Sequence, residues 1–290
     1  MSITDPTSPT KTAFVFAGGG SFGAIQVGMM HSLAAHEISA DMVVGSSVGA
    51  LNGAFYAGDP TLKGVLELET IWRGLTRQDV FPITWRTLLG FIRRRDFLIP
   101  HDGIQKLVDD HIPFRNLQDA RLPLHIVATD IISGDSVVLS EGPADQAIIA
   151  STAIPGAFAP VRYKDFYLAD GAISSNTPIK VAVAKGANRL IILPTGFACS
   201  TSVPPIGAVA NALHALTLLI ARQLVSELED LDPGIKYFVV PPLCPLVGSP
   251  YDFSRTADHI GRAIESTDAW LAQGGLQQGG IPDAMRPHSH

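Results

Sequence analysis

The chain has 290 residues, of which 46% are hydrophobic and 17% charged, with a formal net charge of −6 at pH 7. The length and apolar content suffice for a large buried core, and the acidic balance argues against a nucleic-acid-binding role, which needs a basic surface. The two cysteines, Cys199 and Cys244, are too few for a metal-ligand cluster or a disulfide framework, and we expect both to be ordinary buried thiols.

The two ends of the sequence are predicted to be flexible tails around one domain. Residues 1–11 are polar, contain two prolines and lack the basic start and apolar core of a signal peptide. No internal repeat, low-complexity segment or Ser/Gly-rich linker divides the sequence that follows. We therefore expect a single domain over 12–280, a second tail over 281–290, and a cytoplasmic protein.

Short runs rich in valine, isoleucine and phenylalanine recur along the chain and are mostly continuous. Continuous apolar runs are typical of strands buried on both faces of a sheet. Helical patterns lie between them, as at 23–38 and 178–186, and this alternation predicts an α/β layered domain with a mainly parallel central sheet. The expected strands are 12–17, 41–44, 122–130, 189–194 and 236–241.

A glycine-rich loop, "AGGGSFG" at 17–23, follows the first expected strand and opens the first helix. Gly18, Gly20 and Gly23 match the dinucleotide-binding pattern G-x-G-x-x-G, but that pattern also needs an acid at the end of the second strand. The nearest acid, Asp41, lies at the start of that strand instead. The other use of such a loop is an oxyanion hole, in which backbone N–H groups and a helix N-terminus face a reacting carbonyl.

The second strand runs into "GSSVG" at 45–49, which fits the nucleophile pattern G-x-S-x-G with Ser47 at its centre. Such a turn forces the serine backbone into a strained conformation between strand and helix, and Gly45 and Gly49 relieve the crowding. The N–H of Val48 then faces the same oxyanion as the glycine loop. Ser46 occupies the position before the nucleophile.

The segment 60–115 departs from the strand–helix alternation and is predicted to be a helical insertion or lid. It combines aromatic residues with a basic cluster. One interpretation is a packed helix with a solvated arginine face. The other is peripheral contact with anionic lipid head groups. The residues concerned are Trp85, Phe91, Arg93, Arg94, Arg95 and Phe97.

A serine nucleophile needs a base within hydrogen-bond reach. None of the nine histidines lies in a recognisable catalytic setting, so an acid is the better candidate. Asp170 follows a short strand and precedes a polar turn and a helix that has Pro178 near its start. Further along, the apolar stretch 206–221 is short for a bilayer span and carries polar residues, so we expect a buried or interfacial helix.

Four blocks in this order resemble the patatin-like phospholipase family, and the resemblance covers roughly residues 12 to 195. The blocks are the glycine loop at 18–23, "GSSVG" at 45–49, "ASTAIPGAFAPV" at 150–161 and "LADGAISSNTPIKVA" at 168–182. The resemblance implies a three-layer α/β/α sandwich with no metal or organic cofactor. It also implies a Ser–Asp dyad, in which Ser47 attacks an ester carbonyl and Asp170 takes its proton and later activates water. The oxyanion is then held by Gly18, Gly19 and Gly20.

The sequence departs from the family pattern at Phe22, where relatives commonly carry arginine or lysine. Phenylalanine supplies no positive charge, so a phospholipid, a lysolipid, a neutral lipid and a simple acyl ester all stay open as substrates. Acyl transfer to an alcohol or thiol is an alternative reaction, although malonyl-transferase-like enzymes place histidine where Ser46 stands here. A catalytically weak lipid-binding member of the fold is a further alternative. No particular oligomeric state is predicted.

Overall fold

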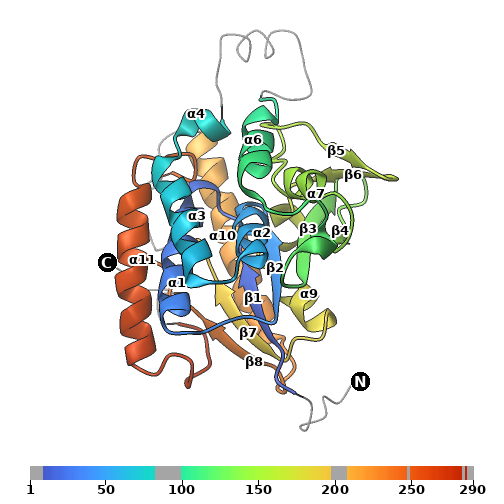
Figure 1. Cartoon of the computed structure of the whole chain (residues 1–290). Coiled ribbons are helices and arrows are strands. Elements are labelled where there is room, and N and C mark those ends of the chain that lie inside the picture. Colours follow the sequence, from blue (N-terminus) through green and yellow to red (C-terminus); the bar gives the residue numbers. More distant parts are fainter. Residues whose placement is uncertain (1–8, 82–98, 197–207, 247–248, 283–284, 286–290) are drawn as a thin grey trace.

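The computed structural model describes residues 9–81, 99–196, 208–246, 249–282 and 285, with only the backbone described for 208–217 and 221. Its eight-stranded sheet has the order β5-β6-β3-β2-β1-β7-β8, and β4 pairs with β3 (Figure 1). The parallel strands are β1 (Thr12–Phe16), β2 (Met42–Ser46), β3 (Leu124–Asp130), β7 (Arg189–Leu193) and β8 (Lys236–Val239). The antiparallel strands are β4 (Ser136–Leu139), β5 (Val161–Tyr163) and β6 (Phe166–Ala169).

The five parallel strands are the five that the continuous apolar runs predict, which confirms a mainly parallel sheet. Their side chains alternate between two cores, as β1 shows. Phe14 and Phe16 belong to one apolar cluster, whereas Ala13 and Val15 belong to the other, and all four are fully buried. A strand buried on both faces has no polar face, so its sequence shows no alternation.

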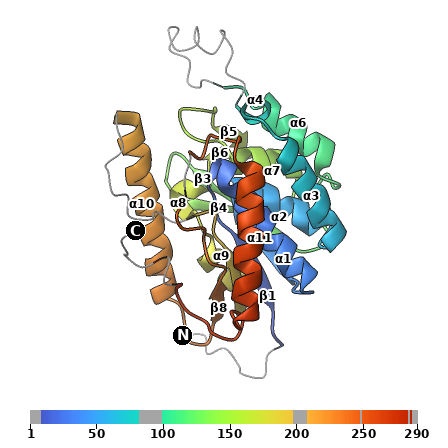
Figure 2. The same ribbon diagram turned by 90° about the vertical axis from the view of Figure 1, so that its left-hand side faces the viewer.

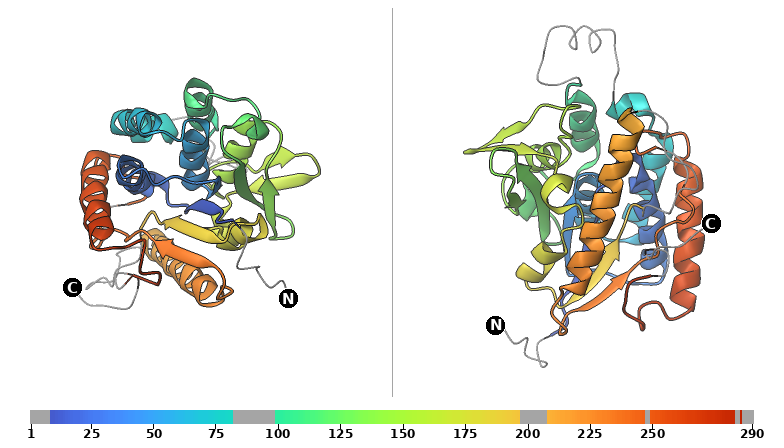
Figure 3. Two further views of the ribbon diagram at one scale, coloured as in Figure 1. Left: turned by 60° about the horizontal axis from the view of Figure 1, so that its bottom comes forward. Right: turned by 180° about the vertical axis from the view of Figure 1, so that it is seen from behind.

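Helices cover both faces of the sheet, which gives the expected three-layer sandwich (Figure 3). One layer contains α1 (Gly23–Ala35) and α2 (Val48–Gly58), with α3 (Leu62–Gly74) and α11 (Thr256–Ala272) packed against α1. The other contains α9 (Ile179–Ala184) and α10 (Ala208–Glu229), and Figure 2 shows α10 as a long helix along the outside of this layer. The other helices of the described residues are η1 (Gly20–Phe22), α4 (Arg77–Val80), α6 (Asp102–His111), η2 (Leu117–Asp119), α7 (Ala144–Ser151) and α8 (Ala172–Ser175).

The insertion expected at 60–115 is helical in its described parts, which are α3, α4 and α6. Helix α3 begins at a cap in which the Thr61 side chain accepts a hydrogen bond from the Gly64 N–H (3.2 Å). It buries Val65, Leu68 and Trp72. The aromatic and arginine residues singled out for lipid contact, from Trp85 to Phe97, lie outside the described residues.

The apolar stretch near 206–221 belongs to α10, whose later part packs on the sheet through the buried side chains of Leu224 and Leu228. Within the described residues, no helix combines the length and hydropathy that a membrane crossing requires. Two observations differ from the sequence-based expectations. Met285, inside the segment expected to be a tail, is buried against the same core, and Cys244 is disulfide-bonded rather than a thiol.

Candidate active site

Ser47 lies in a strained turn between β2 and α2, with φ 54° and ψ −128°. This left-handed φ is unfavourable for a residue with a side chain and persists where the surrounding structure enforces it. Both flanking glycines are required by close approach. A Cβ on Gly45 would collide with the backbone of Gly49, and a Cβ on Gly49 would collide with the carbonyl of Phe16. The glycines of "GSSVG" thus allow α2 to begin directly against β1 and β2.

The strained turn is fixed by a buried hydroxyl from another element. The Oγ atom of Ser151, at the end of α7, accepts a hydrogen bond from the Ser47 N–H (2.9 Å) and donates to the carbonyl of Val127 in β3 (2.6 Å). Ser151 is fully buried. The block at 150–161 is recognisable in the sequence, but the role of Ser151 is not, because its partners come from distant segments.

Ser47 and Asp170 are brought together from segments 123 residues apart. The Ser47 Oγ donates a hydrogen bond to Oδ2 of Asp170 (2.7 Å), and Oδ1 of Asp170 accepts from the Ala172 N–H (2.8 Å). The carbonyl of Asp170 accepts from the Thr129 hydroxyl at the end of β3 (2.8 Å). Both carboxylate oxygens are therefore engaged, and the one facing Ser47 is held in line with its hydroxyl.

The buried position of Asp170 changes its acidity. Burial raises the pKa of this carboxyl from 3.8 to about 6, against the hydrogen bonds from Ser47 and Ala172, which lower it. The group is only 3% exposed. At neutral pH the carboxylate is mostly ionised, so it can accept a proton, and its raised pKa makes it a stronger base than an exposed aspartate.

The glycine loop runs directly against Ser47. A Cβ on Gly18 would lie 3.0 Å from the Cβ of Ser47. Gly18 is held on both sides, since its N–H donates to the Asn176 carbonyl (3.0 Å) and its carbonyl accepts from the Thr195 hydroxyl (2.6 Å). The Gly18 amide therefore already has an acceptor.

The other three candidate donors differ from Gly18. Within the described part of the chain, the N–H groups of Gly19, Gly20 and Val48 have no protein acceptor. Gly20 has φ +60°, and a Cβ there would collide with the carbonyl of Pro250. The described structure thus leaves these three backbone amides without an acceptor.

Phe22 is the last residue of η1 and packs among apolar side chains. It is half-buried against the main core, and its ring meets the ring of His259 edge-on, with centroids 5.7 Å apart. Phe22 therefore contributes packing here and no charge.

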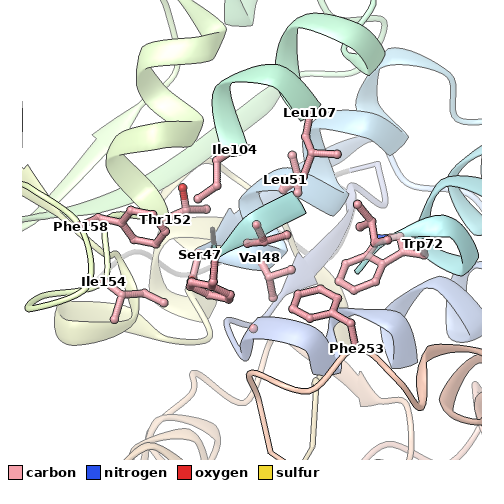
Figure 4. A pocket seen from close by; sticks show the side chains of 14 residues that line it. Ser47, Val48, Leu51, Trp72, Ile104, Leu107, Thr152, Ile154, Phe158 and Phe253 are labelled. Atoms are coloured by element: carbon pink, nitrogen blue, oxygen red, sulfur yellow. The ribbon is translucent and has the colours of Figure 1, made fainter. Parts of the chain in front are cut away.

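A pocket opens onto Ser47 and is almost entirely apolar (Figure 4). Its cavity volume is about 50 Å³, and it continues into space that is open to solvent. Its walls come from η1, α2, α3, α4, α6 and several of the segments that connect them to the rest of the fold. The lining residues are Gly20, Ser47, Val48, Leu51, Trp72, Leu75, Val80, Phe81, Ile104, Leu107, Thr152, Ile154, Phe158 and Phe253.

Apart from Ser47, the polar side chains in this lining hydrogen-bond to the protein. The Thr152 hydroxyl donates to the Ile148 carbonyl (2.9 Å), and the Trp72 indole N–H donates to Oδ1 of Asn52 (2.9 Å). No charged side chain lines the pocket as far as the structure describes it. An apolar chain fits such a wall, because it needs no hydrogen-bond partner there.

The loop at 249–253 completes the site, although sequence reasoning found no motif in the last hundred residues. The Pro250 carbonyl accepts from the Ser21 N–H (2.8 Å), and the Ser249 carbonyl accepts from the Ser21 hydroxyl (3.1 Å). Phe253 lines the pocket and stacks on Trp72. The pKa of Tyr251 is raised by burial and by the charge of Asp170.

The described residues contain neither a cluster of metal-ligating side chains nor a histidine bonded to Ser47. No group of three or more histidine, cysteine, aspartate or glutamate side chains is placed to hold a metal ion there. The hydroxyl of Ser47 has an aspartate as its partner, and no described histidine side chain is bonded to it.

These observations place the chain in a structural class of α/β proteins. The chain is an α/β sandwich in which a serine, held in a strained strand-to-helix turn, is hydrogen-bonded to a buried aspartate beside an apolar pocket. The sequence model of the patatin-like phospholipase family matches residues 14–183. The chain belongs to the patatin-like phospholipase family, a family of lipid hydrolases.

Similar proteins come from distant organisms. An uncharacterised NTE family protein of Mycobacterium tuberculosis is 28% identical over 214 residues, which are 73% of this chain and 55% of that protein. Lysophospholipase NTE1 of Scheffersomyces stipitis is 27% identical over 199 residues, which are 66% of this chain and 12% of that protein. The chain therefore spans about half or less of the length of these relatives.

Among solved structures, human GIVD cytosolic phospholipase A2 in complex with methyl γ-linolenyl fluorophosphonate has a similar fold. The TM-score is 0.53 at 13% sequence identity, and the match covers 95% of this chain and 58% of that one. At this identity the likeness concerns the fold alone.

Proposed function

We propose that the chain hydrolyses carboxylic ester bonds of lipids through an acyl-enzyme on Ser47, with Asp170 as the general base. The observation that carries this proposal is the 2.7 Å hydrogen bond from Ser47 to a buried carboxylate at the mouth of an apolar pocket. A serine needs such a base to become a nucleophile, and a fatty acyl chain needs such a pocket.

In the first half-reaction, the Ser47 oxygen attacks the ester carbonyl while its proton passes to Oδ2 of Asp170. The negative charge on the carbonyl oxygen is then stabilised by the N–H groups of Gly19, Gly20 and Val48. When the tetrahedral intermediate collapses, the bond to the alcohol breaks, and the alcohol leaves with the proton from Asp170. The acyl group stays on Ser47.

In the second half-reaction, Asp170 takes a proton from water, and the resulting hydroxide attacks the acyl-enzyme. The intermediate collapses with release of the fatty acid, and the proton returns to Ser47. The alcohol part of the substrate lies outside the uncharged pocket. Together with Phe22, this favours substrates recognised by their acyl chain over substrates recognised by a phosphate.

Hydrolysis of a p-nitrophenyl ester series from short to long acyl chains tests the proposal. Ser47→Ala and Asp170→Asn are each expected to lower kcat by at least about 10³-fold, because each removes a group that the reaction needs. Ser46→Ala is the matched control, since this buried hydroxyl has no hydrogen-bond partner within the described chain. Turnover by folded Ser47→Ala at the wild-type rate would refute the proposal. Ester formation from an added alcohol would indicate acyl transfer.

Lipid substrates raise the question of access from a membrane. Contact through Trp85, Phe91, Phe97 and the arginines at 93–95 remains a prediction from the sequence. Co-sedimentation with anionic and neutral liposomes measures it, and absence of binding to both would contradict it.

A further inference from the structure

Three polar side chains from three helices form a buried chain of hydrogen bonds behind the pocket wall. The indole N–H of Trp72 on α3 donates to Oδ1 of Asn52 on α2 (2.9 Å), and Nδ2 of Asn52 donates to Oε1 of Gln26 on α1 (2.9 Å). Gln26 and Asn52 are fully buried, and Trp72 is 2% exposed. An amide in such a place is costly unless its hydrogen bonds are satisfied.

This network of hydrogen bonds binds the backbone at both ends of the glycine loop. Nε2 of Gln26 donates to the carbonyl of Ala17 (2.8 Å), the residue immediately before Gly18, and to the carbonyl of Leu193 in β7 (2.9 Å). Nδ2 of Asn52 also donates to the carbonyl of Gly23, where the loop enters α1 (3.0 Å). The segment between Ala17 and Gly23 is therefore fixed at both ends.

Both amide groups use both of their N–H donors and their oxygen on these partners. Each N–H₂ group donates two hydrogen bonds. The Gln26 oxygen accepts one from Asn52, and the Asn52 oxygen accepts one from Trp72. Apolar residues of similar shape could fill the same space without this network, because a buried polar group adds little net stability. What the network adds is a defined position for the backbone that it binds.

Trp72 connects the network to the pocket. Its ring lines the pocket (Figure 4). The ring stacks on Phe253, with centroids 6.1 Å apart and 17° between the planes, and its N–H donates to Asn52. The residue therefore has two separable contributions. The ring shapes the cavity, and the N–H anchors Asn52.

We propose that Gln26, Asn52 and Trp72 are positioning residues that hold the glycine loop in register with Ser47. This inference rests on the proposed function. The three side chains touch no reacting atom and act through the backbone of Ala17 and Gly23. Their loss is expected to affect the rate of the chemical step, which depends on the placement of the loop amides, more than the binding of the acyl chain.

The experiment compares Gln26→Met and Trp72→Phe with wild type, using the p-nitrophenyl ester that wild type cleaves fastest. Both variants are expected to lower kcat by about 10- to 100-fold while KM changes by less than about threefold. Trp72→Phe keeps an aromatic ring in the wall and removes only the donor and part of the ring. It therefore remains a valid test if Gln26→Met does not fold.

Two controls separate positioning from other effects. Phe253→Leu changes the same part of the pocket and removes the ring stacked on Trp72 but removes no hydrogen bond of the network, so it is expected to alter KM and chain-length preference more than kcat. Asn188→Ala removes an amide that accepts from the Lys11 N–H (2.8 Å) at the start of β1, so it is expected to lower the melting temperature without lowering kcat.

The outcomes are distinct. Wild-type kcat in folded Gln26→Met and Trp72→Phe overturns the inference, as does a kcat loss that Asn188→Ala reproduces at an equal loss of melting temperature. If folded Ser47→Ala turns over the ester at the wild-type rate, the proposed function is overturned, and this inference with it. Ser47-dependent turnover with a selective loss of kcat in the two variants supports both.

Discussion

Asp170 is subject to two opposing influences, which together set its chemistry. Burial disfavours the charged carboxylate, whereas the hydrogen bonds from Ser47 and Ala172 favour it, and burial has the larger effect. The result is a pKa of about 6, close enough to neutrality for the group to accept a proton and release it again within one turnover.

This pKa predicts the acid limb of the pH–rate profile. The protonated carboxyl cannot accept the Ser47 proton, so kcat/KM is expected to fall tenfold per pH unit below about pH 6 and to level off above it. Stopped-assay measurements of ester hydrolysis over about pH 4.5 to 8.5 measure the limb, with Ser46→Ala as a control that should share it. A midpoint near 4 would contradict the assigned effect of burial.

At the scale of elements, the turn between β2 and α2 depends on a third element, α7. Ser151→Ala removes the acceptor of the Ser47 N–H and the donor to Val127, leaving two buried backbone groups without their partner. We expect the free energy of unfolding to fall by about 1–3 kcal/mol. We also expect kcat to fall by about tenfold, because Ser47 is then less well oriented.

Ser32→Ala is the matched control for this prediction. Ser32 is also a buried serine whose hydroxyl bonds to a backbone carbonyl, that of Ile264 (3.2 Å), at the contact between α1 and α11. It should lower stability and leave kcat unchanged. Denaturant unfolding and ester hydrolysis, measured on both variants, separate the two effects. An equal loss of kcat in both would show that Ser151 contributes only stability.

The elements also show what the sequence can and cannot predict. The parallel strands and the "GSSVG" turn were predictable because each depends on local composition, a continuous apolar run or glycines at fixed spacing. Strand β6 is the short strand expected before Asp170. Strands β4 and β5 have only 4 and 3 residues, are partly exposed and give no such pattern. Gln26 and Asn52 are ordinary polar positions in helical sequences, and their role emerges only when α1, α2 and α3 pack together.

At the scale of the whole molecule, the ionised Asp170 carboxylate lowers the stability of the folded protein. The carboxyl of Asp170 has a pKa of 3.8 as an ordinary side chain and about 6 when folded, so the folded protein binds its proton more tightly than the unfolded chain. Ionisation therefore costs stability. The cost is absent below about pH 4, grows as the pH rises through 6, and is then constant.

Asp170→Asn removes this charge and should reverse the cost while abolishing activity. A shift of about two pH units corresponds to roughly 3 kcal/mol, so the stability of the variant relative to wild type is expected to rise by up to that amount between about pH 4 and pH 8. Because asparagine also differs from a protonated aspartate in its hydrogen bonds, the change with pH is the quantity to measure, by urea unfolding at both pH values. Ser32→Ala, which changes a buried hydroxyl and no titratable group, is the control and should show no comparable rise. A relative stability that stays constant with pH would mean that Asp170 is not destabilised by burial, and the fold would then accommodate its base without loss.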